Sequence, residues 1–316
     1  MGIWKNGIMG VVVGDALGCP VQFESRAEVA RHPVTGMRGF GTFNLPAGSW
    51  TDDSSLTLAL LESIKRNGGI DCTDIMDNFV KWLDDGAFTP YGYAYDIGRG
   101  TIDAIRKYKC EHKPHEAGSP AENNNGNGSL MRIMPAVLYC IERALPADES
   151  VDIIHRVGGL THAHIRANIA CGLYYFMAAA VVSHNGSLSE CLQKGLGDGF
   201  AFYEAQLANC VELTYYDRLR DLERLAGLGE DSIRSTGYVV DTLEAAVWSL
   251  ATTDSFEKAL LKAVNLGDDT DTVGAIAGGL AGLYYQVIPE AWVNVLQRRE
   301  WIESLIEETE HALHSV

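Results

Sequence analysis

The stretch NLGDDTDTVGAIAGGLAGLYY, residues 265–285, places three aspartates and two threonines directly ahead of a run of apolar and small residues. This pattern predicts a buried helix that begins near Thr270. The carboxylates of Asp268, Asp269 and Asp271 could simply occupy the first turn, where free backbone N–H groups and the positive end of the helix dipole stabilise negative charge. Taken alone, the stretch is therefore an ordinary acidic helix start.

A second stretch repeats the pattern. In WTDDSSLTLALLESIKRNG, residues 50–68, an amphipathic run follows Thr51, Asp52 and Asp53. If the fold brings the two helix starts together, at least four carboxylates share a small volume, and each like-charged pair costs about 1–4 kcal/mol at contact distance. Divalent cations relieve such repulsion. Carboxylate and hydroxyl oxygens suit Mg²⁺, Mn²⁺ or Ca²⁺, and they disfavour zinc.

Helical periodicity runs through the whole chain, with almost no alternation of the kind that strands show. Clusters of glycine, proline, asparagine and aspartate separate the helical segments. No linker, low-complexity tract or change in composition divides the sequence, so we expect a single all-α domain over residues 1–316. The expected helices span residues 8–17, 54–66, 74–84, 101–108, 130–143, 151–158, 164–183, 188–208, 217–225, 242–251, 255–264, 270–286 and 301–314.

Two of these helices carry glycines at four-residue spacing. Gly10, Gly14 and Gly18 lie on the first helix, and Gly274, Gly278 and Gly282 lie on the helix after the DDTDT motif. Such rows let two helix backbones approach closely. We interpret both rows as sites of tight helix packing, which would bring the two ends of the chain into one core.

The composition excludes several classes of protein. A net charge of −17 opposes attraction to phosphate backbones or anionic membranes, so we expect neither nucleic-acid nor membrane binding. The seven cysteines form no CxxC pair, which indicates reduced thiols in a cytoplasmic protein rather than a disulfide or zinc framework. The start of the chain, MGIWKNGIMG, lacks the features of a signal peptide.

One apolar run, residues 165–183, is long enough to raise the question of a membrane span. Arg166 and Asn168 interrupt it near its start, which leaves fewer apolar residues than a bilayer requires. We therefore expect this run to form a buried central helix.

Five segments in this order resemble the ADP-ribosylglycohydrolase family, in particular its dinitrogenase reductase activating glycohydrolase type. They are GVVVGDALGCPVQFE (10–24), SWTDDSSLTLAL (49–60), GNGSLMRIMPAVL (126–138), THAHIRANIACGLYY (161–175) and GDDTDTVGAIAGGLAGLYY (267–285). The resemblance implies an all-α, single-domain enzyme with two Mg²⁺ or Mn²⁺ ions in a cleft. It also implies a reaction in which ADP-ribose is removed from a modified side chain or a small conjugate.

The resemblance further implies which residues form the site. The six metal-ligand positions of the family correspond to Thr51, Asp52, Asp53, Asp269, Asp271 and Thr272. The loop that lies against the ADP-ribose corresponds to Asn127, Gly128 and Ser129, with Met131 and Arg132 following, and His162 matches a histidine near the ligand.

These carried-over positions also have simpler interpretations. Glycine lets a backbone come close to a ligand, and N–H groups at a helix start can hold a diphosphate, but a glycine-rich loop before a helix is often only a turn. His162 could equally be a helix cap or a solvated ring. His164 matches no family position, and we expect it at the surface.

The chemistry can be argued from the residues as well. Hydrolysis at the anomeric carbon of a ribose passes through an oxocarbenium-like state, so the site must hold the sugar, deliver water and assist the leaving group. Two adjacent cations could bind ribose hydroxyls or a bridging water and lower the pKa of that water. We assign the general base to Asp53, with Asp52 and Asp271 as the other candidates. No Ser-His-Asp or Cys-His arrangement is identifiable, so we expect no covalent intermediate.

Two other functions remain open. Oxygen sites for hard metals also serve phosphate chemistry, so the chain could be a Mg²⁺-dependent hydrolase of another nucleotide-like or phosphorylated small molecule. It could also be a member of the family that binds ADP-ribose without catalysis. The six intact metal positions argue against a purely binding role.

One position departs from the family pattern. The segment GDALGCPVQF places Gln22 where an acidic residue near the reacting ribose is usual, and glutamine cannot act as a base. The alternatives are loss of activity, replacement by Glu24, or water activated by the ions together with Asp53, with Gln22 positioning substrate or water; we expect the last. Pro20 should end the first helix and favour extended backbone, in which Glu24 would face the same side as Gln22, about 6–7 Å further along.

Overall fold

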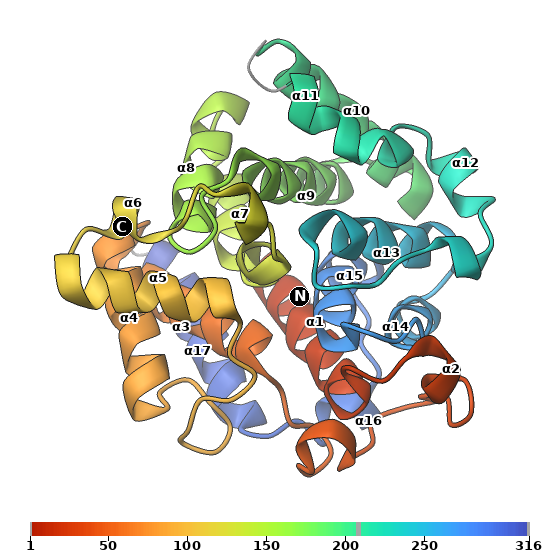
Figure 1. Ribbon diagram of the computed structural model, residues 1–316, viewed down its shortest axis with the longest axis horizontal. Helices are drawn as coiled ribbons and strands as arrows, with labels where there is room; N and C mark the ends of the chain where they lie inside the picture. The colour runs from red at the N-terminus through yellow and green to blue at the C-terminus, as the bar shows by residue number, and fades with distance from the viewer. Residues whose placement is uncertain (1, 207–209, 315–316) are drawn as a thin grey trace.

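Two helices from opposite ends of the chain lie side by side at the centre of the molecule. The computed structural model describes residues 2–206 and 210–314. Within it, α1 (Ile3–Gly18) and α15 (Thr270–Tyr285) form the most extensive contact between any two helices (Figure 1). Both are buried on almost every side. Because neither helix presents a polar face to water, this pair forms the centre of the core.

Glycines line the contact between α1 and α15. A Cβ atom placed on Gly10 would lie 2.1 Å from the carbonyl oxygen of Gly278, and one placed on Gly18 would lie 2.4 Å from the Cα atom of Asp271. The two backbones are therefore closer than any side chain would allow. This confirms the interpretation of both glycine rows, and it sets the C-terminal end of α1 against the acidic start of α15.

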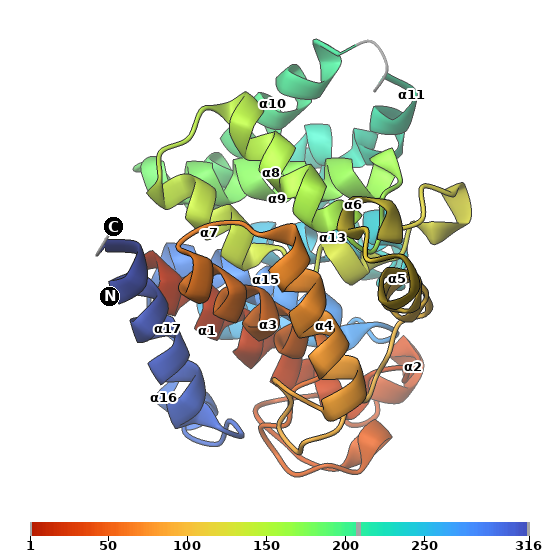
Figure 2. The ribbon, with the colours of Figure 1, turned by 90° about the vertical axis from the view of Figure 1, so that its left-hand side faces the viewer.

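The other helices surround this pair (Figures 1 and 2). They are α2 (Arg26–Val29), α3 (Asp52–Asn67), α4 (Cys72–Asp85), α5 (Arg99–Glu111), α6 (Pro114–Ala117), α7 (Met134–Glu142), α8 (Ala147–Gly159), α9 (Ile165–Ser183), α10 (Leu188–Glu204), α11 (Cys210–Leu213), α12 (Leu222–Ala226), α13 (Val239–Ala251), α14 (Phe256–Val264), α16 (Glu290–Val293) and α17 (Arg299–His314). Helices α3, α7 and α17 pack on α1, whereas α9, α13 and α14 pack on α15. The last helix, α17, packs along α1, so that Gly2 lies against the side chain of Glu310.

The expected all-α fold is confirmed. Among the described residues, the only β pairings are three isolated bridges, of which one joins Gly126 to Tyr238. Short 3₁₀ turns occupy Cys19–Val21, Gly41–Phe43, Glu122–Asn124, Asn127–Ser129, Thr214–Arg220 and Glu230–Ser232. The expectation of a single domain over 1–316 stays a prediction.

Helix α9 is the apolar run that raised the membrane question. Of the helices in the described ranges, it alone is long and apolar enough to cross a bilayer, and 78% of its most apolar window is buried inside the protein. It packs between α8, α10 and α15. The expectation of a buried central helix is therefore confirmed.

Most of the expected helices have somewhat different bounds in the structure, and three of them show why. The one expected at 130–143 begins only at Met134, because a 3₁₀ turn precedes it and Pro135 lies in its first turn. The one expected at 217–225 is divided at Asp221, whose side chain accepts a hydrogen bond from the backbone N–H of Arg224 and so starts α12. The one expected at 188–208 ends at Glu204, and its last two expected residues lie outside the described ranges.

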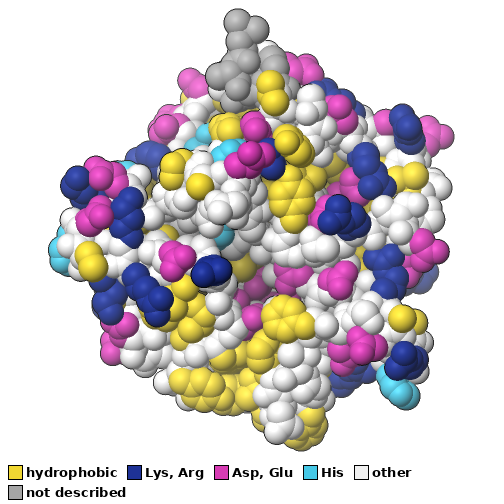
Figure 3. Space-filling model, in the orientation of Figure 1, with side chains coloured by type: hydrophobic (Ala, Val, Ile, Leu, Met, Phe, Trp, Pro, Cys, Tyr) yellow, Lys and Arg dark blue, Asp and Glu magenta, His cyan; other side chains and the backbone are white. Residues whose placement is uncertain are grey.

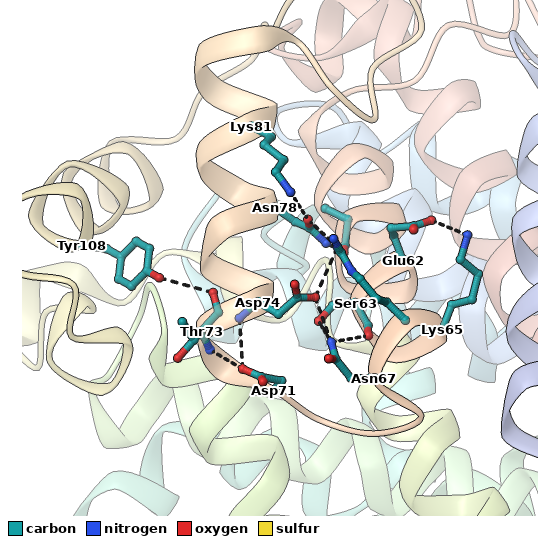
Figure 4. Close-up of polar contacts among 12 residues, drawn as sticks. Glu62, Ser63, Lys65, Asn67, Asp71, Thr73, Asp74, Asn78, Lys81 and Tyr108 are labelled. Atoms are coloured by element: carbon teal, nitrogen blue, oxygen red, sulfur yellow. Dashed lines mark hydrogen bonds and ion pairs between the residues drawn. The ribbon is translucent and has the colours of Figure 1, made fainter. Parts of the chain in front are cut away.

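Helix α3, which begins with the TDD motif, is held at its other end by polar contacts with α4 (Figure 4). The Asp71 side chain caps α4 by accepting hydrogen bonds from the backbone N–H groups of Thr73 and Asp74 at 2.9 and 3.0 Å. The Asn67 amide donates to Asp74 at 2.9 Å, and Asn78 donates to the carbonyl oxygen of Ala59 at 3.0 Å. These contacts hold α3 and α4 together.

Candidate functional site

The two acidic helix starts meet. The Thr51 hydroxyl at the start of α3 lies 3.2 Å from Oδ2 of Asp271 in the first turn of α15, and the Thr272 hydroxyl lies 3.4 Å from Oδ2 of Asp53. Asp52, Asp53 and Asp271 are all at least 95% buried. The condition on which the metal hypothesis depended, that the fold brings the carboxylates together, is therefore met.

Asp268 is the exception among the acidic residues of this region. Its side chain is exposed, and its backbone adopts a left-handed conformation with φ 59° just before α15. Its N–H donates to the carbonyl oxygen of Glu24, and its own carbonyl oxygen accepts from the N–H of Phe23, both at 2.7 Å. Asp268 thus ties the segment after α1 to the start of α15 through its backbone.

Asp15 is a buried carboxylate that the sequence reasoning missed. It lies in α1, is fully buried, and accepts hydrogen bonds from the backbone N–H groups of Thr51 and Ser54 at 3.0 Å and from the Ser54 hydroxyl at 2.5 Å. It therefore satisfies free N–H groups at the start of α3 from another helix. Burial raises the pKa of Asp15 to about 6, although these hydrogen bonds oppose the shift. A single carboxylate in an otherwise apolar helix was the signal that could have revealed it.

Asp96 is the second residue that sequence reasoning missed. It lies in the loop between α4 and α5, where it has a positive φ of 54°, and its side chain lines the cavity beside the helix starts. Burial raises its pKa to about 6, and hydrogen bonds with Gln22 and Asp271 partly offset that effect. No periodicity marks this position, but a non-glycine residue held at positive φ is typical of functional sites.

The carboxylates at the two helix starts lie close together and are only partly compensated by hydrogen bonds from the protein. Burial, followed by repulsion from neighbouring carboxylates, raises the pKa of Asp52, Asp53 and Asp271 well above the ordinary aspartate value, and burial also raises that of Asp269. Among the described residues, Oδ1 of Asp53 and Oδ1 of Asp271 are buried without a hydrogen-bond partner. Oxygens of this kind carry a large desolvation cost unless a cation or a proton meets them.

A cavity of about 830 Å³ opens above these carboxylates. Figure 3 shows it as a central hollow with acidic side chains at its floor and hydrophobic side chains along one edge. The floor is formed by Gln22, Asp52, Asp53, Asp96, Asp269 and Thr272, and the walls include Arg99, Gly100, Thr101, Lys107, Asn123, Asn124, Gly126, Asn127, Gly128, Met131, His162 and Gly237. This volume is large enough for a nucleotide-sized ligand.

A row of aromatic rings begins at the cavity with Phe23, which lines it. The Phe23 ring, which is 66% exposed, lies 6.4 Å from that of Phe43, and the Phe43 ring lies 5.4 Å from that of Tyr95. Tyr93 continues the row at 6.0 Å from Tyr95, and Tyr91 follows at 6.2 Å from Tyr93. The loop 91–99 thus supplies an acidic group of the cavity, Asp96, and three rings of the aromatic row that starts at Phe23.

The expected ligand-binding loop forms part of the cavity wall. The Asn127 side-chain amide donates to Oδ2 of Asp269 at 2.6 Å and to the Thr242 hydroxyl at 3.0 Å, so this loop is tied directly to the acidic floor. Gly128 and Met131 also line the cavity. The side chain of Ser129 is directed elsewhere, because its hydroxyl lies 3.6 Å from the Cys171 sulfur and it does not line the cavity.

The two histidines of the THAH segment have different places. His162 is 4% exposed, lines the cavity and lies against glycines that also line it. His164, which was expected simply at the surface, is half-buried and is the N-cap of α9, where its Nδ1 accepts a hydrogen bond from the backbone N–H of Arg166 at 3.2 Å. The capping role considered for His162 therefore belongs to His164.

The segment after Pro20 differs from the expectation. Helix α1 does end before Pro20, but the backbone continues as a 3₁₀ turn and then a positive φ of 67° at Phe23, instead of running extended. A turn closes there as the N–H of Glu24 donates to the carbonyl oxygen of Val21 at 3.0 Å. As a result Gln22 lines the cavity and Glu24 does not, so the expectation that both face the same side is wrong.

The oxygen atoms at the two helix starts suit hard divalent cations, but the side chains do not yet form a complete set of metal ligands. Aspartate oxygens and threonine hydroxyls surround two partnerless carboxylate oxygens, and this chemistry suits Mg²⁺ or Mn²⁺. In the ranges that the structure describes, no three His, Cys, Asp or Glu side chains already converge as a group able to hold a metal ion. Metal binding therefore stays a prediction.

Comparisons with known proteins agree with the fold and show the family. Residues 5–315 match the sequence model of the family described as ADP-ribosylglycohydrolase. The chain is 32% identical to the ADP-ribosylarginine hydrolase Tri1 of Serratia proteamaculans over 96% of this chain and 78% of that protein. It is 30% identical to the ADP-ribosyl-(dinitrogen reductase) glycohydrolase of Rhodospirillum rubrum over 92% of this chain and 89% of that protein.

A solved structure extends the likeness to three dimensions. It is described as an ADP-ribosylglycohydrolase-related protein complex, and it matches 98% of both chains with a TM-score of 0.76 at 30% identity. The family match covers almost the whole chain, and the order of the motifs and the arrangement of the helices agree with it. This chain belongs to the ADP-ribosylglycohydrolase family, whose members are glycosidic-bond hydrolases.

Proposed function

We propose that this protein is a metal-dependent hydrolase that cleaves the glycosidic bond between ADP-ribose and a modified side chain or small conjugate. One observation carries the metal dependence: the starts of α3 and α15 meet at the floor of a large cavity, with partnerless buried oxygens on Asp53 and Asp271. Two Mg²⁺ or Mn²⁺ ions are the expected cofactors. The residues that would hold them are Thr51, Asp52, Asp53, Asp269, Asp271 and Thr272.

Ions bound there would supply Lewis-acid chemistry, which lowers the pKa of water and orients ribose hydroxyls. The chain itself supplies the rest of the site. Gln22 lines the cavity, and its amide donates toward Asp96 and Asp269, so it holds two carboxylates of the acidic floor in place. The loop of Asn127 and Gly128 offers backbone and amide groups to the remainder of the ligand.

Asp53 is our choice for the general base. Its Oδ2 is engaged by Thr272, whereas its Oδ1 has no partner, so a lone pair is available for a proton. Asp52 lines the same cavity and is the alternative. Asp271 has a partnerless Oδ1 as well, but it does not line the cavity, which makes it the weakest of the three.

The described substrates of two relatives suggest which linkage of ADP-ribose to test first. Tri1 is described as an ADP-ribosylarginine hydrolase, and the Rhodospirillum rubrum protein acts on ADP-ribosyl dinitrogen reductase. We propose arginine-linked ADP-ribose as the first substrate class to test. The charge at the floor is also suited to a cationic guanidinium leaving group.

The test is incubation with peptides that carry ADP-ribose on defined residue types, with Mg²⁺ or Mn²⁺ present, followed by mass measurement of the released group. Release of ADP-ribose that stops in chelator supports the proposal. Cleavage of nucleotides or phosphorylated small molecules but not of any ADP-ribose linkage would favour the alternative Mg²⁺-dependent hydrolase. Tight binding of ADP-ribose without turnover would favour a non-catalytic role.

A further inference from the structure

Arg132 is a buried cation without an acidic partner. Its side chain is fully buried, and no carboxylate among the described residues contacts it. Its Nη2 donates to the Thr161 hydroxyl at 2.8 Å and to the carbonyl oxygen of Val157 at 3.3 Å, and its guanidinium lies 4.7 Å from the centre of the Phe79 ring. An uncompensated buried charge is costly, so its retention requires a reason.

The contact with Thr161 determines the direction of a hydrogen-bond chain. Arginine can only donate, so the Thr161 oxygen must be the acceptor in that pair. Among the described residues, this hydroxyl lies within hydrogen-bonding distance of Arg132 and of Nδ1 of His162, which is 2.9 Å away. The hydroxyl proton therefore has one acceptor within reach, which is Nδ1, and the ring must carry its own proton on Nε2.

The Nε2 edge of His162 faces the cavity. A Cβ atom placed on Gly100 would lie 2.7 Å from Nε2, and one placed on Gly128 would lie 2.7 Å from Cε1 of the same ring. This edge of the ring therefore packs directly against two glycines that line the cavity together with His162, whereas Nδ1 lies against Thr161, which does not line it. Burial and the charge of Arg132 lower the pKa of His162 to about 3, so the ring stays neutral at physiological pH.

We propose that Arg132 and Thr161 are positioning residues that hold His162 as the neutral Nε2–H tautomer, so that it presents a permanent N–H donor to an oxygen of the bound ADP-ribose. The Arg132 guanidinium polarises the Thr161 hydroxyl, and this hydroxyl donates to Nδ1 of His162. The ring proton is therefore held on Nε2, so that His162 can only donate a hydrogen bond to the ligand. The hydrogen bond from His162 to ADP-ribose rests on the proposed function, whereas the assignment of the His162 tautomer is independent of it.

The tautomer is tested first in the unaltered protein. Selective ¹⁵N labelling of the nine histidines, followed by correlation of ring nitrogens with ring protons, distinguishes a protonated from an unprotonated nitrogen. We expect His162 to show a protonated Nε2 and an unprotonated Nδ1 at pH 7, and Thr161→Ser to retain this pattern. A protonated Nδ1 in the unaltered protein would overturn the proposal. His155, whose Nε2 lies 2.7 Å from the Tyr203 hydroxyl, is the internal control and should not change in any variant.

The coupling to the ligand is tested with a double-mutant cycle, with calorimetry of ADP-ribose binding to the Mg²⁺-loaded protein. We expect Thr161→Val to weaken binding about tenfold, in the range for one hydrogen bond to a charged ligand, and Thr161→Ser to restore it. In a His162→Ala background, Thr161→Val should have no further effect. An equal loss in both backgrounds would show a merely structural role and would overturn the proposal. Absence of ADP-ribose binding by the unaltered protein would instead refute the proposed function and leave the tautomer result standing.

Discussion

At the scale of single residues, the carboxylates of the site differ in how many hydrogen bonds they accept from the protein. Asp15 accepts hydrogen bonds from the start of α3 and so serves the structure, whereas Asp53 and Asp271 keep an oxygen without a partner. All of these pKa values are raised by burial. The distinction lies in the hydrogen bonds, because a fully satisfied carboxylate has little capacity left for a ligand.

Gln22 and Glu24 provide the first prediction. We expect Gln22→Ala to lower kcat/KM about five- to tenfold, the effect of about one hydrogen bond, because Gln22 lines the cavity and its amide donates toward Asp96 and Asp269. Gln22→Glu should be tolerated. Glu24→Ala should stay within about twofold of the parent, since Glu24 does not line the cavity. Steady-state kinetics on an ADP-ribosylated peptide measures all three. Loss of turnover in Glu24→Ala, with folding and metal binding intact, would transfer the acid–base role from Asp53 to Glu24.

His155 provides a prediction about pH. Burial lowers its pKa to about 4, below the ordinary value of 6.5, so the unfolded state binds more protons between these values. Its contribution to stability is therefore present above pH 6.5 and is lost as the pH falls toward 4. Between pH 7 and pH 5 this loss is about 1–2 kcal/mol.

The measurement compares the parent protein with His155→Gln, which keeps an amide that can contact the Tyr203 hydroxyl. The free energy of unfolding, from urea titration at pH 7 and pH 5, should fall by about 1–2 kcal/mol more in the parent than in the variant. Effects of the aspartate cluster are common to both proteins and cancel in this difference. Identical pH dependence in the two proteins would show that His155 does not titrate with a lowered pKa.

At the scale of helices, the glycine rows between α1 and α15 determine where the two acidic starts lie. A Cβ atom on Gly278 would lie 2.1 Å from the carbonyl oxygen of Gly10, and the neighbouring atoms belong to backbone that cannot rotate away. The separation of α1 from α15 therefore controls the position of Asp271, which lies at the end of the same contact. Packing and site geometry are coupled through this pair of helices.

Glycine substitution tests that coupling. We expect Gly278→Ala to destabilise the protein by about 1–3 kcal/mol, because the two backbones must separate, and to lower activity as well. Gly197→Ala is the matched control: Gly197 lies within α10 with no atom near its would-be Cβ, so alanine should stabilise the protein by about 0.5–1 kcal/mol. Thermal unfolding measures both. Equal effects of the two substitutions would contradict a close contact at Gly278.

At the scale of the whole molecule, net charge and metal binding are linked. The chain carries −17, and two divalent ions would add four positive charges to give −13. An ion that binds only the folded state stabilises it by about 2.7 kcal/mol at a hundredfold excess over its dissociation constant. We expect Mg²⁺ or Mn²⁺ to raise the unfolding temperature by several degrees more than NaCl of equal ionic strength does.

Asp271→Asn is the control variant for this response. It removes one buried charge from the cluster, so in chelator the variant should unfold at a temperature equal to or above that of the parent. With Mg²⁺ it should lose both the added stability and the turnover. If the parent responds equally to Mg²⁺ and to NaCl, or if Asp271→Asn keeps near-normal activity, the metal assignment is wrong.

Much of this arrangement could be predicted from local sequence patterns. Apolar spacing indicated the helices, the four-residue glycine spacing indicated the contact between α1 and α15, and the two acidic starts indicated the floor of the site. Each of these signals repeats over a few turns of one helix, so a short window of sequence contains it. The segment after Pro20 defeated this reasoning, because backbone pairing between Phe23, Glu24 and Asp268 imposes a turn that no local preference shows.

The tertiary structure alone decided which further groups reach the cavity. Asp96 lies in the loop between α4 and α5, where the sequence shows no periodicity. Its position beside Asp271, which is distant in the sequence, depends on how the fold places this loop. Nothing in the sequence marks Arg132 as buried, and only the fold places it against Thr161, beside His162. Short-range periodicity therefore determines which segments become helices and which residues share a face. Contacts between residues distant in sequence determine which carboxylates are paired and which keep an oxygen free for a ligand.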